Sequence, residues 1–173
     1  TIPVNSKGVT SGIPIKDVRI DWYKPWAKSH LKSLTIAYSK SPYFKSYLPL
    51  LESMFERKDE TLADFTIETS ILLARELGFT STRFMRSSEL SNVDGQKTDR
   101  VINVLKQVGA THYLCGPSAS SYMEPEKFAD SGISFEYMQY NYAESPQLHP
   151  PYDQFVSILD LLFMTGKDAI KYF

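Results

Sequence analysis

The sequence contains few of the residues that would place it in several large classes of protein. It has 1 cysteine, Cys115, so a disulfide within the chain is excluded and a reducing compartment is favoured. Its 3 histidines are far apart and lack the spacing of a zinc site. The longest apolar run, residues 155–165, is interrupted by Ser157 and Asp160 and falls short of the roughly 20 residues that a membrane span requires. We therefore expect a cytoplasmic protein without a membrane span.

An excess of positive charge is also missing. The 19 Lys and Arg residues are balanced by 20 Asp and Glu residues, and no basic block stands out, so nucleic acid is not indicated as a partner. The glycine-rich fingerprints of P-loop and dinucleotide-binding proteins are absent as well. The aromatic content, by contrast, is high, with 11 Tyr and 10 Phe, which suits a packed core and also a pocket for a sugar or nucleoside.

A repeated succession of helix, glycine and strand is the best indication of the fold. Gly78, Gly109 and Gly132 each follow a helical stretch and precede a strand-like one, at residues 79–86, 110–116 and 133–140. This rhythm is typical of parallel strands joined by right-handed helical crossovers. The sequence predicts a single α/β domain with a small, mostly parallel, Rossmann-like sheet flanked by helices. Its expected parts are a helical insertion at about 25–77, a βαβ core at about 78–140 and C-terminal helices at 154–173.

Local signals predict where several elements begin. Pro25 suits the first turn of one helix, and Ser41, followed by a proline, is expected to be the N-cap of the next. Thr61 and Asp64 form a capping-box-like pair at the start of a third helix. The other expected elements are short strands at residues 1–4 and 18–20 and a final helix at 155–165, closed by Gly166.

The stretch from Thr82 to Ser118 reads as one complete βαβ unit, and ligands of open parallel sheets sit at the carboxyl ends of the strands. The helix inside this unit begins at Lys97, where the free N–H groups and the charge of Arg100 suit a phosphate or carboxylate. The alternative is a solvated first turn in which Asp99 complements the helix dipole. The candidate binding residues in this stretch are Arg86, Ser87, Ser88, Lys97, Thr98, Arg100, Gly116 and Ser118.

The segment from Gly116 to Tyr122 follows a strand directly and is rich in small hydroxylated residues. Small residues let a ligand approach the backbone, and Tyr122 can hydrogen-bond sugar or phosphate oxygens. An ordinary Gly-Pro turn with serine caps explains the same residues. Cys115 is not expected to be a nucleophile, because it ends an apolar strand without an adjacent base.

Two residues are candidates for acid-base chemistry. Asp160 lies in an apolar run, where an unpaired carboxylate is costly, so it needs either a helix start capped by Ser157 or a role in a pocket. His30 lies beside the apolar stripe of the first helix, which favours a hydrogen-bonded structural role over a catalytic one.

Taken together, the motifs resemble the WbqC-like family, whose members are linked to gene clusters for O-antigen and other surface polysaccharides. The resemblance covers nearly the whole chain in the expected order. The segments that carry it are Trp26…His30-Leu31-Lys32, Tyr38…Pro42-Tyr43-Phe44, Arg86-Ser87-Ser88-Glu89-Leu90, residues 95–100, Tyr113–Ser118, Tyr122, Pro146-Gln147 and Ser157–Phe163…Gly166. Family members usually begin with a further strand that carries a His-Gln-Pro segment, so we expect this chain to be a truncated or partial family domain.

The resemblance implies acyl or aminoacyl transfer to the amino group of a nucleotide-linked amino sugar for O-antigen assembly. Lys97 and Arg100 would hold phosphate, and Asp160 or His30 would be the base. The residues that would contact sugar or acyl donor are Ser87, Ser88, Ser118 and Tyr122, and Gln147 is a further substrate-binding candidate. The alternatives are a non-catalytic sugar-nucleotide-binding or scaffolding protein of the same pathway and a nucleotidyl- or adenylate-forming enzyme. The sequence indicates no cofactor and no oligomeric state.

Overall fold

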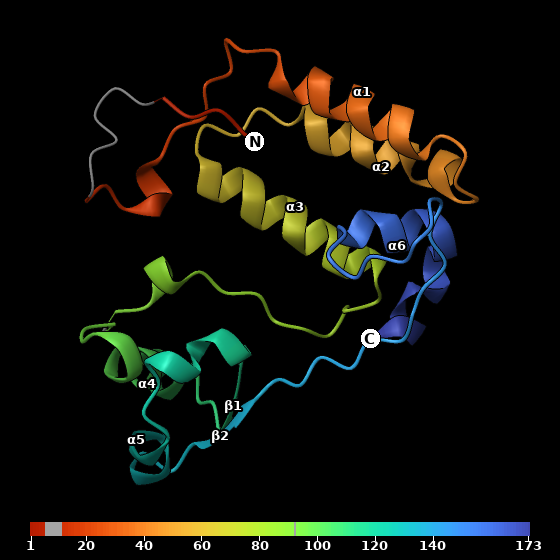
Figure 1. Cartoon of the computed structure of the whole chain (residues 1–173). Helices are drawn as coiled ribbons and strands as arrows, with labels where there is room; N and C mark the ends of the chain where they lie inside the picture. Colours follow the sequence, from red (N-terminus) through yellow and green to blue (C-terminus); the bar gives the residue numbers. More distant parts are fainter. Residues whose placement is uncertain (6–11, 92) are drawn as a thin grey trace. The chain divides into compact units, whose positions relative to one another are not determined.

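The computed structural model describes residues 1–5, 12–91 and 93–173, and these divide into two compact units (Figure 1). Unit 1 comprises Thr1–Thr82 and Tyr142–Phe173, and unit 2 comprises Arg83–Asn141. Unit 1 is helical and unit 2 contains a small parallel sheet, so the protein belongs to the α/β class. The expected single-domain organisation stays a prediction.

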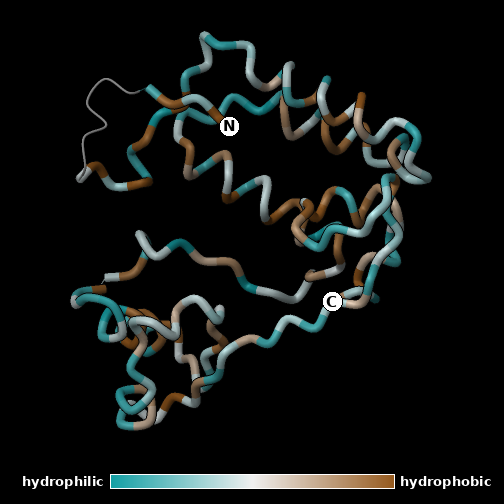
Figure 2. The backbone as a smooth tube through the Cα atoms, viewed as in Figure 1, coloured by the Kyte–Doolittle hydropathy of each residue, from teal (hydrophilic) through white to brown (hydrophobic). Residues whose placement is uncertain are grey.

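Unit 1 is built from helices packed on a shared apolar core. Its α-helices are α1 (Trp26–Tyr38), α2 (Phe44–Glu56), α3 (Leu62–Glu76) and α6 (Ile158–Thr165), with 3-10 helices η1 (Ile15–Asp17) and η4 (Gly166–Tyr172). Hydrophobic residues follow one another along α6 (Figure 2), and Leu162 and Phe163 are fully buried against Leu51 of α2. Full burial of such side chains stabilises the unit by about 1.5–3 kcal/mol each. This core therefore fixes the N-terminal turn of α6, which carries Asp160.

Unit 2 contains the only extended strands among the described residues. Its elements are η2 (Ser87–Glu89), α4 (Lys97–Gln107), β1 (His112–Cys115), η3 (Pro117–Ser121), α5 (Pro125–Asp130) and β2 (Ser134–Tyr137). The two strands pair in parallel, with His112 opposite Ser134 and Cys115 opposite Tyr137. Phe128 of α5 is fully buried and stacks on Phe135 of β2, which holds the crossover helix on the sheet.

The predicted helix–glycine–strand rhythm is confirmed at two of its three positions. Gly109 follows α4 and precedes β1, and Gly132 follows α5 and precedes β2, with φ values of 67° and 73°. Both glycines thus adopt the left-handed conformation that ends a helix without strain. The parallel β1–α5–β2 crossover is the part of the expected sheet that the structure contains.

The third predicted strand, at residues 79–86, is wrong. This segment is irregular, because the backbone carbonyls that would pair with a neighbouring strand accept hydrogen bonds from the guanidinium of Arg75 instead. Its Nη1 donates to the carbonyls of Phe79, at 2.7 Å, and Thr80, and Nη2 donates to that of Thr82, at 3.2 Å. The stretch from Thr82 to Ser118 is therefore not a complete βαβ unit.

Most of the predicted helix starts are confirmed. Thr61 caps α3 by accepting a hydrogen bond from the Asp64 N–H at 3.1 Å, and Ser157 caps α6. The Ser41 prediction is wrong, because α2 begins only at Phe44. The expected strands at 1–4 and 18–20 are reduced to two isolated antiparallel bridges, one between Val4 and Ile20 and one between Arg19 and Thr61. Over the part of the chain that the structure describes, none of the helices combines the length and apolar character that crossing a membrane demands.

Candidate functional site

The N-terminus of α4 in unit 2 is built on an unusual backbone turn. Gly95 has a φ of 91°, and a Cβ there would lie 3.2 Å from the backbone nitrogen of Arg100, so the turn requires glycine. Lys97, the first residue of the helix, has a φ of 48°, which is uncommon for a residue with a side chain. The helix start is therefore folded closely onto the loop that precedes it, and its first-turn N–H groups lie beside an exposed lysine.

Thr98 connects this helix start to the segment that follows β1. Its side chain is fully buried, and its hydroxyl accepts a hydrogen bond from the Glu124 N–H at 3.1 Å. The same hydroxyl lies 3.4 Å from the carbonyl oxygen of Tyr122, to which it donates. The structure thus brings the start of α4 next to the end of η3, as expected if both lie at the carboxyl end of β1. Thr98 itself is occupied by these backbone contacts.

The charges around the start of α4 leave two cations available. Asp99 forms an ion pair with Lys127 of α5 at 2.9 Å, and Lys127 also contacts Glu124 at 3.2 Å. These hydrogen bonds to Asp99 and Glu124 raise the pKa of Lys127. Lys97 and Arg100 are exposed and form no ion pair with any residue that the structure describes. The carboxylate that could have neutralised the helix start is therefore held by another lysine.

The segment after β1 presents hydroxyl groups beside this helix. Ser118 and Tyr122 are exposed, and Gly116 lies close to the Tyr140 hydroxyl, which is 4.0 Å from the position a Cβ would take. Cys115 is buried at the end of β1, as expected for a residue that is not a nucleophile. Burial, together with a hydrogen bond to Cys115, raises the pKa of Tyr113 to about 12. The accessible polar groups after this strand are thus hydroxyls.

Arg86, Ser87 and Ser88 also belong to unit 2, but no strand precedes them. Ser87 and Ser88 are exposed in η2, and Arg86 is half-buried at its N-terminal side. Because the predicted strand at 79–86 does not form, these residues do not lie at the end of a strand. Their role in binding stays a prediction.

Asp160 lies in unit 1, in the first turn of α6. The Ser157 side chain accepts a hydrogen bond from the Leu159 N–H at 3.3 Å, and the Ser157 carbonyl accepts one from the Asp160 N–H at 2.9 Å. The predicted cap is therefore confirmed. Asp160 is 5% exposed, and its carboxyl Oδ1 has no hydrogen-bond partner among the described residues. A buried carboxyl with one oxygen available can accept a proton or a donor group.

The surroundings of Asp160 adjust its acidity. Burial raises its pKa, whereas a hydrogen bond donated by the Tyr38 hydroxyl and the nearby charge of His149 act in the opposite direction. Burial and Asp160 together also raise the pKa of Tyr38. The sequence indicated Tyr38 only as part of an apolar helix stripe, and His149 only as one of three scattered histidines. A helical repeat cannot predict that one tyrosine points its hydroxyl at a carboxyl from a distant helix.

Gln147 holds the loop that carries His149. Its side-chain amide donates to the Asp153 carbonyl at 2.7 Å and accepts from the Asp153 N–H at 2.9 Å. The two hydrogen bonds close the loop in the manner of a backbone pair. Gln147 therefore positions this loop, and its predicted contact with substrate stays a prediction.

His30 occupies an aromatic cluster in unit 1. Its ring packs edge-to-face on Trp26 and Phe55, with centroid distances of 5.4 and 6.0 Å, and burial lowers its pKa. These contacts are those of a structural residue, while a catalytic role stays a prediction. Among the described residues, no group of three or more histidine, cysteine or acidic side chains could hold a metal ion.

Comparison with known proteins places these residues in a family. The model of the WbqC-like protein family matches residues 1–172. The chain is 33% identical over 174 residues to the uncharacterized protein Rv1507c of Mycobacterium tuberculosis, covering 99% of this chain and 74% of that protein. No solved structure matches the chain. The extent of the family match and the similarity to the mycobacterial protein show that this chain belongs to the WbqC-like protein family.

Proposed function

We propose that this WbqC-like protein binds a nucleotide-linked amino sugar and transfers an acyl or aminoacyl group to its amino nitrogen. The observation that carries the proposal is the start of α4, where Lys97 and Arg100 form no ion pair with a described residue while Asp99 is held by Lys127. A diphosphate is the part of a nucleotide sugar that such a site suits best.

The helix dipole and the charged side chains of Lys97 and Arg100 together favour phosphate binding at this helix start. A helix N-terminus carries roughly half a positive charge and offers unpaired N–H groups to an anion. Hydrogen bonds to charged groups contribute about 1.5–3 kcal/mol each. One phosphate contact from Lys97 and one from Arg100 therefore give about 3–6 kcal/mol, which corresponds to a Kd between about 6 mM and about 40 μM. Ser118 and Tyr122, which follow β1, are available for the sugar hydroxyls. The other residues proposed to contact the ligand are Arg86, Ser87, Ser88, Gly116 and Gln147.

The chemical step needs a base for the amine. The amino nitrogen attacks the acyl carbonyl carbon of an activated donor, a C–N bond forms, and the leaving group departs with the electron pair of the bond that breaks. The proton lost from nitrogen goes to a base, for which we propose the Asp160 carboxylate, with the His30 imidazole as the second candidate. The raised pKa of Asp160 suits this role, because a base with a pKa nearer neutrality accepts a proton more readily.

A non-catalytic binding protein is the second candidate, and one observation favours it. Unit 2 by itself contains Lys97, Arg100, Ser118 and Tyr122. Unit 2 has a core of its own around Phe128, so it can bind a sugar nucleotide without a catalytic partner. Under this proposal, a nucleotide-linked amino sugar stabilises the protein and no product forms.

Further proposals concern the setting of this activity. We propose that the β1–β2 pair is the centre of a Rossmann-like sheet and that the protein acts in the cytoplasm on precursors of O-antigen or another surface polysaccharide. The parallel crossover supports the first proposal. Membership of the WbqC-like family supports the second.

Calorimetric titration with a nucleotide-linked amino sugar tests the proposed phosphate site. Lys97→Ala and Arg100→Ala should each weaken binding about tenfold or more, because each removes a charged hydrogen bond. Lys106→Ala is the matched control, since Lys106 is exposed on the same helix at its C-terminal end and should leave binding unchanged. Equal affinities for all three variants would contradict the site.

Mass spectrometry then separates the two candidate functions. The wild-type protein is incubated with the amino sugar nucleotide and a panel of activated acyl donors, and the mass of the acylated product is sought. Asp160→Asn should abolish product while leaving calorimetric binding intact. Binding without product from any donor would support the non-catalytic candidate.

A further inference from the structure

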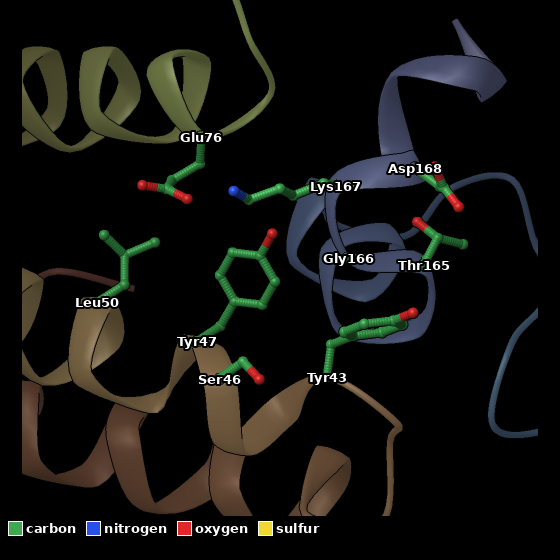
Figure 3. A pocket seen from close by; sticks show the side chains of 9 residues that line it. All are labelled: Tyr43, Ser46, Tyr47, Leu50, Glu76, Thr165, Gly166, Lys167 and Asp168. Atoms are coloured by element: carbon green, nitrogen blue, oxygen red, sulfur yellow. The ribbon is translucent and has the colours of Figure 1, made fainter.

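A cavity lies in unit 1, formed by residues to which no role has been assigned. It has a volume of about 500 Å³ and opens between α2, the C-terminal end of α3 and the junction of α6 with η4 (Figure 3). This volume lies within the range of small-molecule sites in proteins, about 300–1,000 Å³. The cavity is therefore large enough for a small organic molecule.

One wall of the cavity depends on a close contact between Gly166 and Tyr43. A Cβ on Gly166 would lie 2.8 Å from two ring carbons of Tyr43, and Gly166 has a φ of 61°. The Tyr43 ring thus lies directly against the backbone at the end of α6 (Figure 3). This packing fixes one aromatic wall relative to Lys167, which is the next residue in the chain.

The other side chains present opposite charges toward each other. Figure 3 shows the Glu76 carboxylate and the Lys167 ammonium group pointing toward one another, with the Tyr47 hydroxyl directed into the space beside them. Neither Glu76 nor Lys167 forms an ion pair with a described residue. Asp168, the other acidic residue of the lining, is held by Lys171 at 2.8 Å. The cavity therefore offers one available anion and one available cation.

Tyr47 adds a hydrogen-bond donor beside these charges (Figure 3). Burial, and then the negative charge of Glu76, raise the pKa of Tyr47, so its hydroxyl keeps its proton at neutral pH. Tyr47 is 7% exposed, so the packing around its side chain restricts the position of the hydroxyl. Leu50 and the Tyr43 ring supply apolar surface in the same lining.

We propose that this cavity binds a small zwitterion, a free α-amino acid with an apolar side chain. The ammonium group of the ligand contacts Glu76, and its carboxylate contacts Lys167 and the Tyr47 hydroxyl. Leu50 and Tyr43 contact the apolar side chain. Two opposite charges with a donor beside them match both ends of such a ligand, whereas an anion or a cation alone leaves one charge of the cavity unpaired. The site is independent of the proposed transfer reaction.

Calorimetry on the full chain with three probes of one shape tests the proposal. L-leucine carries both charges, L-leucinamide carries only the positive charge, and 4-methylpentanoate carries only the negative one. L-leucine should bind with a Kd of about 1 mM or tighter, and each singly charged probe should bind about tenfold more weakly or worse.

Two charge-removing variants identify the contacts. Glu76→Gln and Lys167→Met should each weaken L-leucine binding about tenfold or more. The matched controls are Glu52→Gln and Lys45→Met on α2, which are exposed, do not line the cavity and should bind as the wild type does. Tyr47→Phe removes only the hydroxyl and should weaken L-leucine and 4-methylpentanoate but not L-leucinamide.

Two results would overturn the proposal. The first is the absence of any heat of binding when L-leucine is added to about 10 mM, because the Kd would then be weaker than a specific site of this kind requires. The second is binding that survives both Glu76→Gln and Lys167→Met. In either case Glu76 and Lys167 are only neighbouring surface charges. Loss of transfer activity plays no part in the readout, so the proposed function is tested separately.

Discussion

Replacing Gly166 by alanine should destabilise unit 1 through two separable effects. The backbone there has a φ of 61° and a ψ of −133°, and positive φ costs a residue with a Cβ about 1–2 kcal/mol. The new methyl group would also meet three atoms of the Tyr43 ring at 2.8–3.1 Å, and such overpacking costs about 1–3 kcal/mol. The expected loss in free energy of unfolding is therefore about 2–5 kcal/mol, a large part of the stability of a small domain.

Urea denaturation followed by tryptophan fluorescence measures this loss, because both tryptophans, Trp22 and Trp26, belong to unit 1. Gly78→Ala is the matched control, since Gly78 also has a positive φ, 94°, but has nothing within 4 Å of the Cβ position. Gly166→Ala should cost about 1–3 kcal/mol more than the control, and Tyr43→Ala in the same chain should remove that excess. Equal losses at the two glycines would refute the reasoning.

Three further predictions follow from the other contacts. Burial raises the pKa of Asp160 above its unfolded value, so the ionised carboxylate destabilises the folded state at neutral pH but not in acid. Asp160→Asn should therefore raise the melting temperature near pH 7, and this increase should shrink as the pH falls toward about 4. Each unit of difference between the folded and unfolded pKa values is worth about 1.4 kcal/mol. An advantage that does not vary with pH would contradict this. Thr98→Val should lower the free energy of unfolding by about 1–3 kcal/mol and speed amide exchange at Glu124, whose N–H loses its acceptor, while Thr98→Ser retains most of the stability. Gln147→Ala should speed exchange at the Asp153 amide about tenfold, measured by NMR, because the loop loses both of its closing hydrogen bonds.

The sequence predicted best those features that depend on neighbouring residues. The Thr61 and Ser157 caps and the glycines before β1 and β2 are local, since each needs only the backbone within one or two turns. Family membership also followed from the motifs, because they span almost the whole chain.

The errors lie where contacts made by individual side chains compete with a local backbone preference. Residues 79–86 have the β-branched and aromatic composition of a strand, but three of their backbone carbonyls accept hydrogen bonds from the guanidinium of Arg75. Gln147 gave no signal that its amide would close a loop onto Asp153. The cavity beside Gly166 is lined by residues from three separate helical segments, so no sequence motif could predict it.

The proposed function depends on a phosphate site at the start of α4, and an amide chemical-shift map tests this site most directly. The labelled protein is titrated with a nucleotide-linked amino sugar and the shifts are assigned residue by residue. The largest shifts should cluster at residues 97–100 and 116–122, and the double variant Lys97→Ala/Arg100→Ala should abolish them. Shifts that cluster elsewhere, or that persist in the double variant, would contradict it.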